Sequence, residues 1–323
     1  MYFYKMEERV RKWRLILGKD ADKNNDDQIS LSPEMKGMDD VLDALYDSER
    51  QAGLGSSSPN VNRWLGDIRK YFPSSVVQLM QKDELEQKLQ RTYQSTRRAA
   101  EKKNNRSTVE TLLVRALEAR YQSTAPVKQA EYHQGDDDYA AEMRLVYVAF
   151  PNDDDVCALF AEALMTRTPW ALWNLRSGEP APNASTLEAI EVLETAMKRA
   201  ESVGSEPHPG VLHIYIHVME MSPFPERALR ACDKLRRLVP SSGHLCHMPS
   251  HIDVRCGHYY EAVVSNDRAI QADRVYLANE GAMNFHTLSR IHNFHLKIYA
   301  SLFLGQYNSA MEAAEELTAT TPE

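Results

Sequence analysis

Glycine is scarce in this sequence, with 13 residues among 323. Because glycine opposes helix formation, and because alanine, leucine, glutamate, arginine, lysine and methionine are plentiful, the composition favours helix throughout. No run of 18 apolar residues occurs, which excludes a membrane-spanning helix. The first residues, MYFYKMEERVRKW, lack the apolar segment and cleavage site of a signal peptide, so we expect no membrane partner.

Several signatures of common chemistry are also missing. The sequence has no Gly-rich phosphate loop, no Walker motif and no GxSxG, which gives nucleotide and serine-hydrolase chemistry no support. Lysine and arginine form no basic block and the formal net charge is -8, which argues against a nucleic-acid partner. The four cysteines form no CxxC pair and indicate reduced thiols in a cytoplasmic protein: Cys157, Cys232, Cys246 and Cys256.

Residues 1–90 are predicted to form a smaller helical segment. Its loop at residues 20–34 matches an EF-hand in part. Asp27 stands where an EF-hand needs glycine, and Pro33 stands where it needs the bidentate glutamate. We therefore interpret this segment as a solvated acidic loop. Residues of about 6–90 resemble the helical leader of bacterial proteins that carry a von Willebrand A domain, through EERVRKWRLILG, GLG and RWLGDIRKYFPSSVVQLMQ. The metal-binding DxSxS sequence of that domain is absent, so the resemblance implies no ligand-binding activity.

From about residue 91 onward the pattern changes to paired helices. Capping boxes at Ser107–Glu110 and Ser185–Glu188 predict two helix starts. Two further helices are expected over 138–150 and 153–165, each preceded or opened by a run of aspartates that the helix dipole favours at an N-terminus.

A period typical of the tetratricopeptide repeat (TPR) runs through the downstream half. Ala228 and Ala262 are 34 residues apart, which is the repeat length, whereas about 14 extra residues precede the next copy, near 274–287. One hairpin cannot bury its apolar face alone, so we predict an all-α fold in which TPR-like hairpins stack into an α-solenoid over 91–323. The residues that match the repeat are Gly257, Tyr259, Ala262 and Ala269; Gly305, Tyr307, Ala310, Leu317 and Pro322; and Ala228, Leu235 and Pro240.

Ten of the eleven histidines lie between His208 and Tyr299. Their spacings of three and four residues put them on one face of each of three helices. In the repeat frame they occupy equivalent positions on the first helix of three successive hairpins, and these first helices are expected to line the concave wall of the solenoid. We therefore expect one groove to collect His213, His217, His244, His247, His251, His292, His295, Tyr299 and Glu220.

Imidazoles gathered in this way suit a divalent transition metal, because buried histidines need partners for both ring nitrogens and imidazole binds Zn, Cu and Fe well. The pairs His213/His217 and His247/His251 have the i, i+4 spacing that lets two rings chelate one ion. The HExxH motif of zinc proteases is absent, because Ile214 follows the first of these histidines. The alternative is a groove of polar histidines that bond to one another, to water and to a bound peptide.

A proline interrupts the second of these helices. Pro249 stands between His247 and His251, and inside a helix it removes one backbone hydrogen bond and kinks the axis. We expect one kinked helix here. The kink is either a constraint of the fold, or it aims the two rings and frees a backbone carbonyl.

Residues of about 155–300 resemble a histidine-rich family of bacterial and fungal TPR proteins. The resemblance rests on LFAEALM, HPGVLHIYIHVMEMSPFPERAL, VPSSGHLCHMPSHIDVRCGHY and HNFHLKIYASLFLGQY. It implies the fold and the histidine groove rather than a reaction. Family members usually carry a further helical pair upstream with its own histidine. The leader-like segment replaces that pair here, so the resemblance implies an incomplete site if the pair supplies a ligand.

The sequence supports two functions. The first is a TPR-type protein-interaction scaffold, with a protein or peptide as partner and a transition metal (Zn, Cu or Fe) in the groove. The second is a metal-dependent enzyme, a hydrolase or oxidoreductase, in which Glu220 or Tyr299 is the catalytic residue that handles protons. An open coordination position and a pocket that closes around a small molecule would distinguish the enzyme from the scaffold.

Overall fold

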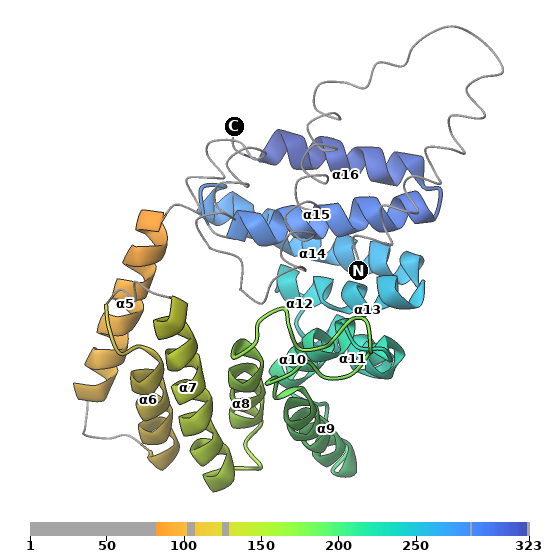
Figure 1. The fold of residues 1–323 in the computed structure, drawn as a ribbon. Coiled ribbons are helices and arrows are strands. Elements are labelled where there is room, and N and C mark those ends of the chain that lie inside the picture. Colours follow the sequence, from red (N-terminus) through yellow and green to blue (C-terminus); the bar gives the residue numbers. More distant parts are fainter. Residues whose placement is uncertain (1–81, 102–106, 125–128, 285, 322–323) are drawn as a thin grey trace, which may run out of the picture. The chain divides into compact units, whose positions relative to one another are not determined.

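A computed structural model describes residues 82–101, 107–124, 129–284 and 286–321, which belong to one compact unit (Figure 1). Every named element in these residues is a helix, and the one strand-like feature there is an isolated bridge between Trp173 and Pro180. The expected all-α class is therefore confirmed for the described part of the chain. The EF-hand-like loop and most of the leader-like segment lie outside it.

Five helices precede the histidine region, and each packs against the next. The predicted division of the chain near residue 90 stays a prediction, and α5 runs across this position. The bounds are α5 (Lys82–Glu101), α6 (Thr108–Arg120), α7 (Gln129–Ala149), α8 (Asp154–Thr166) and α9 (Thr186–Ser202).

The histidine region follows, and its helices also pack in chain order. Contacts between α10 and α13 and between α12 and α15 then bring together helices that are distant in the sequence. The bounds are α10 (Pro209–Glu220), the 3-10 helix η1 (Pro225–Ala228), α11 (Leu229–Leu238), α12 (Gly243–His247), α13 (Pro249–Cys256), α14 (Tyr259–Glu280), α15 (His286–Phe303) and α16 (Tyr307–Thr320).

Three helical hairpins follow one another in this region: α10 with α11, α13 with α14, and α15 with α16. The first helices of the last two hairpins are followed by Gly257 and Gly305, whose φ angles of 83° and 69° favour glycine. The extra residues near 274–287 lengthen α14 to 22 residues and supply the connection to α15. The small residues of the repeat are buried, as expected where paired helices touch: Ala228, Ala262, Ala269 and Ala310.

One of the two predicted capping boxes is present. Ser107 and Glu110 cap each other's backbone N–H groups at the start of α6. Ser185 precedes α9 but makes no such bond, because its hydroxyl accepts from Arg167 at 2.8 Å. The two terminal guanidinium nitrogens of Arg144, Nη1 and Nη2, donate to the carboxylate of Glu188. The second box was therefore a wrong prediction, since tertiary contacts occupy both of its side chains.

The two aspartate runs also differ. Asp153 caps α8, because its carboxylate accepts from the backbone N–H of Val156 at 3.0 Å, as the dipole argument predicts. The earlier run lies inside α7, which begins at Gln129. There Asp136 accepts from Arg120 and Asp137 from Arg167, at 3.1 and 2.6 Å. These aspartates are therefore stabilised by arginines from other segments, and not by the N-terminus of a helix as the sequence predicted.

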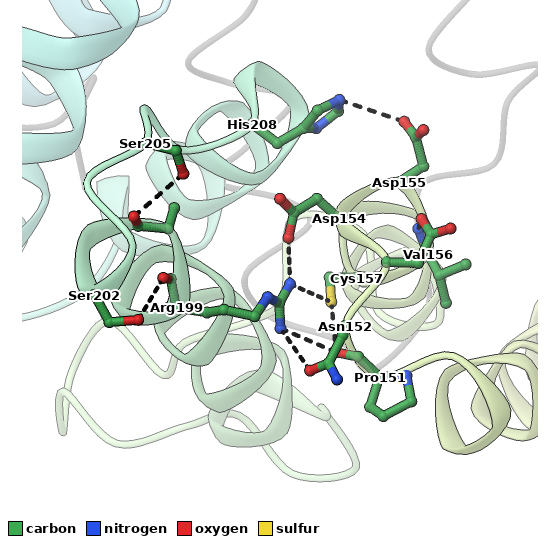
Figure 2. A network of polar contacts seen from close by, with 12 residues as sticks. Pro151, Asn152, Asp154, Asp155, Val156, Cys157, Arg199, Ser202, Ser205 and His208 are labelled. Atoms are coloured by element: carbon green, nitrogen blue, oxygen red, sulfur yellow. Dashed lines mark hydrogen bonds and ion pairs between the residues drawn. The ribbon is translucent and has the colours of Figure 1, made fainter.

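An arginine ties α9 to the start of α8 (Figure 2). The Arg199 guanidinium donates to the Asp154 carboxylate, to the Pro151 carbonyl at 3.1 Å and to the Cys157 sulfur at 3.8 Å. Burial nevertheless raises the pKa of the Cys157 thiol, so this cysteine is a structural group rather than a reactive one.

The predicted kinked helix is two helices. The α12 helix ends at His247, Met248 keeps right-handed helical backbone angles, and Pro249 occupies the first turn of α13, a position that tolerates its missing N–H. The Ser250 hydroxyl donates to the carbonyl of His247 at 2.6 Å. This break gives the two flanking histidines independent orientations.

The hydrophobic core runs through α7 to α13, with large buried side chains such as Phe160, Leu164, Leu212 and Ile216. All four cysteines are free thiols. Among the described helices, none combines the length and the apolar composition needed to cross a bilayer.

Candidate metal centre

Six of the seven predicted metal-ligating histidines come together in two groups of three. We name them the first triad (His213, His217, His244) and the second triad (His247, His251, His292). Within each triad the candidate ligand atoms lie within 4.8 Å of one another. The prediction that the histidine rows of separate helices face one another is therefore confirmed. The packing of α10 on α13 and of α12 on α15 produces it.

The second triad is the tighter one. The Nε2 atom of His251 lies 2.8 Å from Nε2 of His247 and 3.3 Å from Nε2 of His292. Two nitrogens bound at about 2.0–2.1 Å to one tetrahedral zinc ion lie about 3.3 Å apart. The two separations from His251 are thus already near the spacing that a metal ion imposes, and all three ligand atoms lie within 4.8 Å of one another.

The other ring nitrogen of His247 has a partner that sets its protonation. Its Nδ1 lies 2.7 Å from Oδ1 of Asn266, and the amide nitrogen of Asn266 donates to the carbonyl of Ala262 at 2.8 Å. The amide therefore presents its oxygen to the ring, which must donate from Nδ1. The Nε2 atom is left with a lone pair, as a metal ligand requires.

His251 is oriented in the same way by a carboxylate. Its Nδ1 lies 2.5 Å from Oε2 of Glu220, so it donates there and turns its Nε2 towards the other two rings. Lone pairs that face each other at 2.8 Å repel unless a positive charge stands between them. A proton can bridge one pair of these nitrogens, whereas a metal ion accepts all three lone pairs.

The first triad has the same elements in a looser form. The Nε2 atoms of His213 and His244 lie 3.0 Å apart. The ring of His213 also contacts the ring of His217, with centroids 4.7 Å apart. The Nδ1 atom of His217 lies 3.3 Å from Oε1 of Glu220.

Glu220 thus connects the two triads through one oxygen each. Burial raises the pKa of this carboxyl, but the charges of His251 and His217 and their hydrogen bonds hold it well below its usual value. It is a carboxylate at neutral pH. Both oxygens engage imidazole nitrogens, so this geometry makes Glu220 a group that orients ligands.

Burial keeps several of these imidazoles neutral. Desolvation, followed by the neighbouring imidazoles, lowers the pKa of His213 to about 3 and that of His244 to about 4. His247 is fully buried, and the same causes bring its pKa well below its usual value. A neutral imidazole is the form that binds a metal ion.

Two predicted residues lie beside the triads. His295 is one turn from His292, with ring centroids 6.5 Å apart, but it belongs to neither triad. Tyr299 packs its ring against Phe303 at a centroid distance of 4.7 Å. Neither residue adds a ligand to the six histidines in this arrangement.

Sequence reasoning missed Asn266. It lies on α14, one helical turn after Ala262, a buried residue of the predicted repeat. Residues four apart on a helix share a face, so the repeat register contains a signal that points Asn266 at the histidine helix.

A histidine–carboxylate contact on α14 and α15 was also missed. His286 lies with Nε2 3.0 Å from Oδ1 of Asp273, and Asn293 donates to Oδ2 of the same carboxylate at 2.7 Å. His286 is near enough to His244 to contribute to its lowered pKa. The Asp273 carboxylate also lies against Gly243, the residue that precedes His244.

Comparison of the chain with protein-family models, with curated proteins and with solved structures returns no match.

Proposed function

We propose that this protein binds a transition metal ion through the second triad, in a TPR-type scaffold whose partner is a protein or peptide. One observation carries the proposal. The Nε2 atoms of His247, His251 and His292 converge, while Asn266 and Glu220 hold the opposite nitrogens of two of these rings. Outer partners of this kind fix the tautomer and orientation of metal-binding histidines in known metal sites.

The chemistry of the three ligands limits which metal ions the second triad is expected to bind. Three imidazoles and no thiolate favour Zn, Cu or Fe over the hard cations Mg and Ca, which prefer oxygen. The scaffold proposal draws support from the three successive hairpins and from the buried alanines at the repeat positions. Free thiols at all four cysteines fit a reducing, cytoplasmic setting.

A metal-dependent enzyme is the second candidate, and the number of ligands favours it. Three protein ligands leave a fourth position on a tetrahedral ion for water or substrate, which is the arrangement of catalytic zinc sites. His292 is exposed, so solvent reaches the second triad from its side. A hydrolase or oxidoreductase is the class of reaction that such an open position serves.

The test is metal retention by the full chain. Protein stripped with a chelator, supplied with Zn²⁺ and dialysed should retain zinc, and His292→Asn should weaken that binding. His258 is an exposed histidine outside the triads, so His258→Asn is the matched control and should bind as the parent does. A parent protein that retains neither Zn²⁺ nor Cu²⁺ nor Fe²⁺ would overturn the proposal.

A further inference from the structure

The first triad is a second cluster of metal-ligating side chains with its own geometry. His213 and His217 come from α10 and His244 from α12, so the three rings come from two different helices. The 3.0 Å separation between Nε2 of His213 and Nε2 of His244 is near the value of about 3.3 Å that a tetrahedral ion imposes. All three rings are half-buried.

We propose that this protein holds two transition-metal ions, one in each triad, and that Glu220 orients one ligand of each. This inference rests on the proposed metal binding at the second triad and adds the second ion and the shared carboxylate. The chemical class of ligand is the same at both sites, a divalent transition-metal cation coordinated by three neutral imidazoles.

The closest ring contacts among the six histidines fall within the triads. The shortest centroid distances within the first triad are 4.7 and 4.9 Å, and within the second triad 4.6 and 4.8 Å. The rings that meet across the two triads lie 6.2 Å apart for His217 and His251, and 6.4 Å for His244 and His247. His217 and His244, both in the first triad, are also 6.3 Å apart, so the grouping rests on the ligand atoms, which lie within 4.8 Å of one another inside each triad. One ion reaches nitrogens only about 2 Å away, so each triad fits its own ion.

Glu220 joins the two sets without being a ligand. Oε1 faces Nδ1 of His217 at 3.3 Å and Oε2 faces Nδ1 of His251 at 2.5 Å. Each ring therefore has its Nδ1 engaged and its Nε2 available for an ion. The carboxylate also places one negative charge between two sites that would each receive a dication.

This geometry predicts a specific effect of Glu220→Gln. A glutamine has one carbonyl oxygen and one NH₂ group, so it accepts from one of the two Nδ1–H groups and not from both. The ring that faces the NH₂ group must accept at Nδ1 and carry its proton on Nε2, where it no longer binds metal. We expect the affinity for one of the two ions to fall by about 10–100-fold. The other ion should then be the more tightly bound of the two.

The experiment measures metal equivalents in the full chain by elemental analysis after dialysis against Co²⁺ or Zn²⁺, together with the Co²⁺ absorption spectrum. We expect two equivalents in the parent, one in His213→Asn, one in His292→Asn and none in the double variant. His258→Asn, at an exposed position outside both triads, should keep two. Circular dichroism and thermal unfolding establish that each variant is folded. If His213→Asn unfolds, His217→Asn replaces it, because that side chain is 31% exposed.

The outcomes separate the two proposals. A parent with no retained metal overturns the metal function itself. A parent with one equivalent that persists in His213→Asn and disappears in His292→Asn overturns the second ion and leaves the proposed function in place. One equivalent that both variants abolish shows a single shared ion and overturns the two-ion centre. Two equivalents that Glu220→Gln leaves equally tight overturn the role of the carboxylate.

Discussion

Asn266 holds His247 by accepting a hydrogen bond from its Nδ1 at 2.7 Å, while its own amide donates to the Ala262 carbonyl at 2.8 Å. Both side chains are fully buried. The backbone of α14 therefore sets which nitrogen of the imidazole carries the proton. A histidine held in one tautomer by a buried amide is prepared to give its other nitrogen to an ion.

Replacing Asn266 should therefore weaken metal binding without removing a ligand. For Asn266→Ala we expect a loss of about 10–100-fold in zinc affinity, because His247 loses the group that fixes its tautomer. Asn266→Asp keeps an acceptor and should bind zinc more tightly than the alanine variant. Competition with a chromophoric chelator measures both affinities. Equal affinity in the parent and Asn266→Ala would show that the amide has no such role.

Acid should destabilise the metal-free protein before carboxylates titrate. Burial lowers the pKa of His213 to about 3 and of His244 to about 4, whereas the unfolded chain has the ordinary value of about 6.5. The unfolded state then binds more protons. Stability is fully present above about pH 6.5 and falls as the pH drops towards 4, by up to about 1.4 kcal/mol per pH unit for each histidine.

Urea unfolding in the presence of a chelator, at about pH 7.5, 6 and 5, measures this slope. His244→Asn should reduce this slope, because it removes one histidine that binds a proton in the unfolded state and not in the folded state. His258→Asn, at an exposed position, should leave it unchanged. A parent whose stability is the same across this range would contradict the neutral, buried state of the histidines.

A buried ion pair positions α13. Arg236 on α11 donates to both oxygens of Asp253 at 2.6 and 2.7 Å and also to the Ser265 hydroxyl, and Asp253 is fully buried. Arg236→Met leaves that carboxylate without its partner, which should cost about 3–5 kcal/mol in the free energy of unfolding.

The matched control is another arginine of α11. Arg230 pairs with Glu201 at 3.2 Å, but its side chain is 75% exposed. Arg230→Met should cost less than about 1 kcal/mol, because exposed pairs contribute little. Denaturant unfolding compares the two variants, and similar losses would contradict a special role for the pair with Asp253.

Gly243 allows the start of α12 to approach α14. A Cβ atom at this position would collide with the carboxylate of Asp273, which His286 and Asn293 hold in place. Gly243→Ala should cost about 1–3 kcal/mol, as overpacking does elsewhere. In the double variant with Asp273→Ala the collision with the carboxylate is gone, and the contact of the Cβ with the Ala269 carbonyl oxygen at 3.1 Å remains. The two losses measured by denaturant unfolding should then sum to more than the loss of the double variant. Strict additivity would contradict the close approach.

Much of the fold followed from local pattern. The glycines after α13 and α15, and the alanines that recur at the repeat length, predicted where hairpins turn and where their helices touch. Spacings of three and four predicted that histidines would share a helix face. The repeat register then predicted that these faces would meet, because equivalent positions of stacked hairpins point the same way.

Other features depended on contacts that no local pattern contains. Ser185 and Glu188 have the spacing of a capping box. In the fold, however, Arg167 donates to Ser185 and Arg144 donates to Glu188, so neither side chain caps the helix. Pro249 was expected to kink a helix, and the chain instead begins a new helix there. In each case groups distant in the sequence, or a change in helix boundary, outweighed a preference worth about 1 kcal/mol.

The sequence by itself determined the helices, the order of the hairpins and the helix faces that carry imidazoles, because these depend on composition and on spacing along one chain. Only the tertiary structure decided that six histidines divide into two triads, that His295 stays outside them, and that Glu220 and Asn266 choose the nitrogen each ring presents. Ring-to-ring distances of a few ångströms depend on how far apart two helices pack and how each is rotated. Close contacts such as that of Gly243 with Asp273 set these quantities.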